Sequence, residues 1–166
     1  IKINREYARA HNYLGLTHLK KKSYSSAETS LLESIKINPK YAKAHNNLGV
    51  LYEEMGDTAK AIESYRMAQK LDPNDPDSFY NLGLAYNSLE DGENSVRYMV
   101  QAKKVHEKKL GQEGIDRITE KLDQLSKKYA DNNEVESVAS LNLSSEDNAG
   151  SPSQTDINQT SIVSPL

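Results

Sequence analysis

Between residues 1 and 130, apolar side chains recur every third or fourth position, which is the spacing of one face of a helix. Residues 42–71 show this most clearly. Their two halves carry separate apolar stripes, Ala44, Leu48, Leu51 and Met55 in the first and Ala61, Ile62, Tyr65, Ala68 and Leu71 in the second. Gly56 and Asp57 lie between the halves, and an aspartate there can accept hydrogen bonds from the first free amides of the next helix. The pattern predicts two antiparallel helices joined by a tight turn.

The same pattern returns along the chain with a period of 34 residues. Moving back by this step pairs Ala44, His45, Asn46, Leu48 and Gly49 with Ala10, His11, Asn12, Leu14 and Gly15, and moving forward pairs Asn47, Leu48, Gly49 and Tyr52 with Asn81, Leu82, Gly83 and Tyr86. A fixed period of this length is the signature of a helical repeat array. It divides the chain into repeats at 8–41, 42–75 and 76–109.

The turn and cap residues set the expected helix boundaries. Helices are expected near 8–20, 24–37, 42–55, 58–71, 76–89 and 92–108. Ser23, Asp57 and Asp91 are the expected N-caps of the second helices. Pro39 and Pro73 end two of these helices, because proline disfavours helical geometry in the residue before it. Residues 1–4, IKIN, return as 35–38, so we expect 1–7 to be the end of a truncated preceding repeat and the chain to be the C-terminal part of a longer protein.

Two further segments follow the repeats. Residues 113–130 are charged except for a stripe of Ile115, Ile118, Leu122, Leu125 and Tyr129. This predicts a capping helix that covers the apolar flank of the last repeat, with a coiled-coil seam as the alternative. Residues 131–166 contain six acidic residues, no Lys or Arg and no aromatic residue. Such a segment buries too little apolar surface to offset its ordering entropy, so we expect a disordered acidic tail.

The repeat positions carry a resemblance to a known family. The family's 34-residue pattern has a large residue, then Leu-Gly, Tyr, Ala, an aromatic residue, Ala and Pro. This chain matches it in the second repeat with His45, Leu48, Gly49, Tyr52, Ala61, Tyr65, Ala68 and Pro73. This resembles the tetratricopeptide repeat family over roughly two thirds of the chain. The resemblance implies an all-α fold, a right-handed superhelical solenoid of antiparallel helix pairs. The chain departs from the pattern where His11 and His45 replace the large aromatic residue, His18 a tyrosine and Ser95 an alanine.

In that family the first helix of each repeat lines a concave groove, which implies a peptide-binding site here. The residues singled out for it are Asn12, Leu16, Lys43, Asn46, Asn47, Val50, Tyr80, Asn81 and Leu84. An amide side chain donates and accepts hydrogen bonds at once, so Asn47 and Asn81 can pair with an extended peptide backbone, as in the family's sugar-transferase members. The alternative is that these asparagines are solvated or bond to the neighbouring helix. A clamp for a chaperone C-terminal carboxylate is disfavoured, because Asp77 stands where a basic group belongs.

Composition limits the kinds of partner and cofactor that the chain is expected to bind. The 21 basic and 24 acidic residues form no concentrated basic face, which disfavours nucleic acid, and no apolar run reaches the ~20 residues of a membrane span. The chain has no cysteine, and its four histidines lack the spacing of a helical zinc site, so neither a metal nor another cofactor is expected. No arrangement of nucleophile and base is present, so this segment is not expected to be an enzyme.

These observations favour a protein–protein interaction module, a scaffold or adaptor whose groove binds an extended or helical peptide of another protein. Two alternatives stay open. One is the substrate-selecting arm of a larger enzyme, such as a glycosyltransferase, whose catalytic domain lies upstream. The other is a scaffold that self-associates by stacking repeats between chains. A cytoplasmic location is expected.

Overall fold

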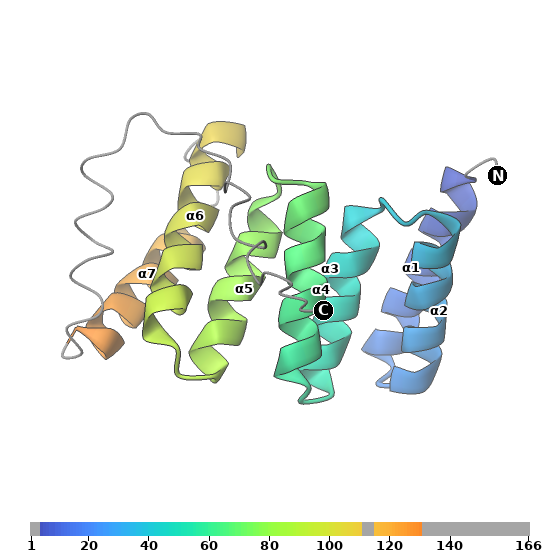
Figure 1. The fold of residues 1–166 in the computed structure, drawn as a ribbon, viewed down its shortest axis with the longest axis horizontal. Coiled ribbons are helices and arrows are strands. Elements are labelled where there is room, and N and C mark those ends of the chain that lie inside the picture. The colour runs from blue at the N-terminus through green and yellow to red at the C-terminus, as the bar shows by residue number, and fades with distance from the viewer. Residues whose placement is uncertain (1–3, 111–114, 131–166) are drawn as a thin grey trace, which may run out of the picture.

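The computed structural model describes residues 4–110 and 115–130. In these ranges the chain forms seven α-helices and no strand (Figure 1). The helices are α1 (Arg5–Lys20), α2 (Tyr24–Ile37), α3 (Ala42–Glu54), α4 (Thr58–Leu71), α5 (Pro76–Ser88), α6 (Gly92–Leu110) and α7 (Asp116–Tyr129).

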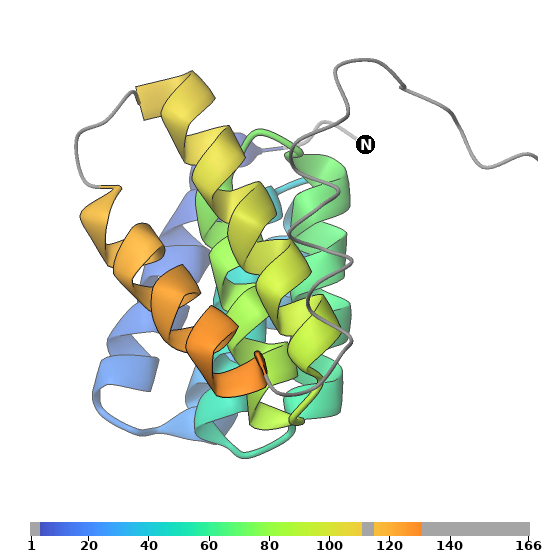
Figure 2. The same ribbon diagram turned by 90° about the vertical axis from the view of Figure 1, so that its left-hand side faces the viewer.

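The helices pack as successive pairs. Helix α1 packs on α2, α3 on α4 and α5 on α6, and each pair contacts the next through α2 with α3 and α4 with α5. Figure 1 shows the pairs side by side in a row, and Figure 2 views the row from the end formed by α6 and α7. The predicted all-α solenoid of helix pairs is confirmed.

Glycines allow the two helices of each pair to approach closely. Gly15, Gly49 and Gly83 are all buried. A Cβ atom added to Gly49 would lie 2.5 Å from the ring of Tyr65, and one added to Gly15 would lie 2.6 Å from Leu31 Cγ. A larger side chain at either position would therefore push the helices of its pair apart.

The turn inside each pair has the same backbone geometry in all three repeats. Lys22, Gly56 and Glu90, which are 34 residues apart, adopt positive φ angles of 56°, 82° and 59°. After each of them the chain closes the preceding helix by a backbone bond from Ser23 N to His18 O, Asp57 N to Tyr52 O or Asp91 N to Tyr86 O. This is the Schellman arrangement, which satisfies carbonyl groups at the end of a helix.

Two of the three expected N-cap residues make a capping hydrogen bond with their side chain, and the third does not. Asp57 Oδ1 accepts from Lys60 N at 3.2 Å and Asp91 Oδ1 from Asn94 N at 3.0 Å, so these two predictions are confirmed. Ser23 is the residue before α2, but its side chain makes no capping bond.

One expected boundary is wrong. Residues 5–7 belong to α1 and not to the end of a preceding helix, because Asn4 caps α1 by accepting from Tyr7 N at 3.3 Å. Arg5 stands where Pro39 stands one repeat later, so no proline delays the helix. Residues 1–3, 111–114 and 131–166 lie outside the described ranges, and so do the predictions made for them.

Helix α7 packs its apolar stripe on the third pair. Ile118, Leu125 and Tyr129 are buried in one cluster with core residues of α5 and α6, among them Phe79, Val96 and Met99. Tyr129 also lies over Gly92 at the start of α6, where an added Cβ atom would come within 2.5 Å of its ring. The exposed side chains of α7 are polar at every position from Asp116 to Lys128. The array therefore ends on a helix with a polar outer face.

Candidate functional site: the surface of the first helices

The residues singled out from the sequence come from α1, α3 and α5, the first helices of the three repeats. We call their shared surface the groove surface. Lys43 is exposed on it, and seven further residues are half-buried: Leu16, Asn46, Asn47, Val50, Tyr80, Asn81 and Leu84. These eight residues all keep some exposed area, and they are a mixture of amide, apolar, aromatic and cationic side chains.

Asparagine side chains link one repeat to the next. Asn47 Nδ2 donates to Asn12 Oδ1 at 2.8 Å, and Asn81 Nδ2 donates to Asn46 Oδ1 at 3.1 Å. Each bond joins a first helix to the first helix of the preceding repeat. The asparagines therefore bond to a neighbouring helix, one of the two roles expected for them. Each bond uses only one N–H group of the donor amide, so Asn47 and Asn81 keep a second N–H and an oxygen for other partners.

Asn12 does not belong to the accessible surface. Asn12 is 3% exposed, because it lies on the side of α1 that contacts α3, where its side chain accepts the hydrogen bond from Asn47. The prediction that Asn12 contacts a peptide is corrected for this reason. Its amide oxygen instead accepts the hydrogen bond from Asn47.

The C-terminal end of the groove surface is bounded by α7. Tyr80 and Leu84 pack against the cluster that contains the α7 stripe, and the guanidinium of Arg117 lies 4.5 Å from the centroid of the Tyr80 ring. This contact is a cation–π interaction. Arg117 was missed by the sequence analysis, because α7 lies outside the 34-residue period and its placement relative to α5 does not follow from that period.

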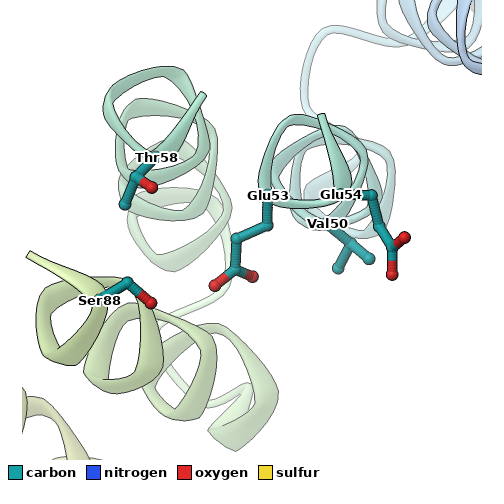
Figure 3. Close-up of a pocket in the computed structure, with 5 residues that line it drawn as sticks. All are labelled: Val50, Glu53, Glu54, Thr58 and Ser88. Carbon is teal, nitrogen blue, oxygen red and sulfur yellow. The ribbon is translucent and has the colours of Figure 1, made fainter. Parts of the chain in front are cut away.

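A depression of about 430 Å³ opens where α3 ends and α4 begins. It is lined by Val50, Glu53, Glu54, Thr58 and Ser88. Figure 3 shows the carboxylate of Glu53 pointing toward the helices that carry Thr58 and Ser88, with Glu54 turned away from it. Of these five residues only Val50 is among the site residues predicted from the sequence.

Tyrosine hydroxyl groups fix two carboxylates of the array. Tyr65 donates to Glu53 Oε2 at 2.6 Å, and Tyr52 donates to Glu28 Oε1 at 2.9 Å. Burial, together with the neighbouring Glu28 carboxylate, raises the pKa of Tyr52 to about 12, and burial beside Glu53 raises the pKa of Tyr65 as well. Both phenols are thus neutral donors at physiological pH, and Glu53 is held at one side of the depression.

The histidines and acidic residues form no metal site in the part of the chain that the structure describes. His45 Nε2 lies 3.0 Å from the carbonyl oxygen of Pro39, and the other three histidines are half-buried within the array. In the same ranges no helix is both long and apolar enough to cross a membrane.

Comparison with known protein families identifies the class to which this array belongs. Models described as tetratricopeptide repeats match residues 42–75 and 77–116, and a TPR repeat model matches residues 20–56. Together these matches cover more than half of the chain. The chain belongs to the tetratricopeptide repeat family.

Solved structures share this fold. The crystal structure of MamA is 30% identical with a TM-score of 0.60, and the match covers 64% of this chain and 62% of MamA. The first TPR domain of Spaghetti (RPAP3), bound to the HSP90 peptide SRMEEVD, is 16% identical with a TM-score of 0.68, covering 78% of this chain and 98% of that one. PcrH, in complex with the chaperone-binding region of PopD, is 16% identical with a TM-score of 0.67, covering 72% and 91%. The comparison with curated proteins gives no match.

Proposed function

We propose that the chain is a protein–protein interaction module that binds a peptide segment of a partner protein on the groove surface of α1, α3 and α5. The observation that carries this proposal is the pair of asparagine bonds between successive first helices. They place Asn47 of α3 beside Asn12 of α1, and Asn81 of α5 beside Asn46 of α3, which brings the predicted contact residues of successive repeats next to one another. Two structures of similar fold, RPAP3 and PcrH, contain segments of other proteins, which supports the same use here.

The groove surface combines the groups that an extended peptide needs. The remaining amide groups of Asn47 and Asn81 can donate to and accept from a peptide backbone regardless of its sequence. Leu16, Val50 and Leu84 supply apolar contacts beside them. The depression next to Val50 offers room for a side chain of the peptide.

We expect modest affinity. Three repeats present a small surface, and binding an extended peptide orders a flexible chain, which opposes association. Specificity then depends on a few side chains that enter the depression or pack on the apolar positions.

A selection experiment tests the proposal. A phage-displayed library of random peptides is panned on the full chain, and the best peptide is titrated by calorimetry against the chain and its variants. Val50→Glu and Lys43→Glu change the groove surface and are expected to weaken binding about tenfold or more, which corresponds to about 1.4 kcal/mol. Met67→Glu is the matched control, because Met67 is 42% exposed on the second helix α4, outside the groove surface.

One result would show that the peptide does not bind to the groove surface. Equal affinity for the chain, Val50→Glu and Lys43→Glu, with circular dichroism showing all three folded, places the peptide elsewhere. A loss of affinity in Met67→Glu alone has the same meaning.

A further inference from the structure

A cation and two tyrosines meet where α4 packs on α5 and α5 packs on α6. Arg66 Nη2 donates to the hydroxyl oxygen of Tyr86 at 2.5 Å, and the guanidinium carbon lies 5.9 Å from the centroid of the Tyr86 ring. The ring of Tyr98 stacks on that of Tyr86, with 5.4 Å between the centroids and 3° between the planes. We call Arg66, Tyr86 and Tyr98 the Arg66 cluster. None of the three belongs to the groove surface.

The same tyrosine position has a different partner one repeat earlier. Tyr52 is equivalent to Tyr86, and its hydroxyl donates to Glu28 Oε1 at 2.9 Å. The equivalent of Glu28 is Ile62, so Tyr86 has no such carboxylate and bonds to a guanidinium instead. A guanidinium has N–H donors and no acceptor. The Tyr86 oxygen therefore accepts in this bond, and its own proton is left for another partner.

The hydroxyl proton of Tyr86 finds no acceptor among the residues that the structure describes. Tyr86 is nevertheless only 7% exposed. Buried polar side chains nearly always have a hydrogen-bond partner in folded proteins. A buried donor beside a cation is thus the feature that calls for an acceptor, and an anion satisfies both groups at once.

The charge of Arg66 is not balanced by a carboxylate of the described residues. Arg66 is exposed and takes part in none of the ion pairs found there, and Glu63, three residues before it on α4, forms no ion pair with it. Burial acts to lower the pKa of Arg66, but the neighbouring hydroxyls of Tyr86 and Tyr98 more than offset this and raise it. The guanidinium is therefore charged at physiological pH, and it keeps N–H groups for a ligand.

We propose that the Arg66 cluster binds an anionic oxygen group, a carboxylate or a phosphate, at a site separate from the groove surface. Arg66 supplies the positive charge and N–H donors, and the Tyr86 hydroxyl adds a neutral donor beside them. Hydrogen bonds between such donors and an anion are stronger than those between neutral groups. The anion comes either from residues 131–166, which contain six acidic residues and no Lys or Arg, or from a separate molecule.

A titration with simple anions tests the site. Sodium phosphate and, separately, sodium acetate are added to the full chain at constant ionic strength set with sodium chloride, and binding is followed by NMR. The amide signals around Arg66 and Tyr86 and the Arg66 Nε–H signal are expected to shift and to saturate in the millimolar range. Phosphate stands for a phosphoryl ligand and acetate for a carboxylate, so the tighter of the two identifies the class.

Two variants remove the proposed donors one at a time. Arg66→Gln and Tyr86→Phe are each expected to weaken phosphate binding about tenfold, because each removes a hydrogen bond to a charged group. Tyr86→Phe keeps the ring that stacks on Tyr98 and removes only the hydroxyl. Circular dichroism is expected to show both variants folded.

The matched controls carry the same changes elsewhere. Arg97→Gln removes another exposed arginine, which is paired with Glu93 on α6. Tyr52→Phe removes the equivalent hydroxyl, which already donates to a carboxylate. Val50→Glu changes the groove surface. All three are expected to bind phosphate as the unchanged chain does, so the proposal holds or fails independently of the peptide site.

The source of the anion is read from a chain that ends at residue 130. Tighter phosphate binding by this shorter chain than by the full chain assigns the natural anion to residues 131–166, and equal binding assigns it to a separate molecule. Two results overturn the proposal. One is the absence of saturating shifts around Arg66 in both chains, and the other is phosphate binding by Tyr86→Phe and Arg66→Gln that equals that of the unchanged chain.

Discussion

Lys22, Gly56 and Glu90 occupy the same place in the turn of the three repeats, and all three have positive φ angles. This conformation is free of steric penalty only for glycine, since a Cβ atom approaches the following carbonyl oxygen. The second repeat has the residue that the turn requires, whereas the first and third hold a lysine and a glutamate in it. The backbone geometry is thus fixed by the packing of the helix pair and is kept even where the residue opposes it.

Lys22→Gly is expected to stabilise the chain by about 0.5–1 kcal/mol, because glycine adopts a positive φ angle without the steric penalty that lysine has there. The reverse change, Gly56→Ala, is expected to destabilise it by about 1 kcal/mol. No atom lies within 4 Å of a Cβ atom added at Gly56, so only the backbone conformation is tested. Urea denaturation measures both. Lys21→Gly is the control, because Lys21 has a φ of −85° and gains nothing from glycine; equal effects at positions 21 and 22 would contradict the argument.

At the scale of the helices, the sequence predicts most of what is found. Repeat period, prolines and N-cap aspartates are local features, so they place the ends of α2 and α4 correctly. The start of α1 is predicted wrongly because the period carries the boundary over from the second repeat, where Pro39 delays the helix. The sequence also leaves open which asparagine bonds to which, since that depends on the offset between successive first helices. Only the structure shows that Asn12 is buried under Asn47.

The asparagine bonds are expected to couple neighbouring repeats. In a double-mutant cycle, Asn46→Ala and Asn81→Ala should show a coupling free energy of about 0.5–1.5 kcal/mol, the net contribution of one hydrogen bond. Urea denaturation of the two single variants and the double variant gives this value. Asn47 and Asn81 provide the control pair, because each donates to a different partner. A coupling as large in the control pair as in the bonded pair would show that the bonds do not transmit the effect.

At the scale of the whole molecule, the two ends of the array are unequal. A stacked repeat array has an apolar flank at each end, and terminal elements with a polar outer face keep it from associating. Helix α7 has this property on the outer side of the third pair, whereas Ala10, Leu14 and Thr17 on α1 of the first pair are exposed. The stripe of 113–130 predicts the helix from sequence alone. Its contacts with Tyr80 and Gly92 come from outside the period and require the structure.

Removing α7 is therefore expected to make the array associate. A chain that ends at residue 110 uncovers Phe79, Val96 and Met99, which are buried together with the α7 stripe. Their exposure creates a contiguous apolar patch of the kind that marks an interface or an aggregation site. Light scattering should show a mass above that of the monomer that rises with concentration, and a dye that binds apolar surface should become more fluorescent. The control ends at residue 130 and keeps α7, so it should scatter as the full chain does. If the chain ending at 110 stays monomeric with an unchanged melting temperature, α7 is not needed to cover the third pair.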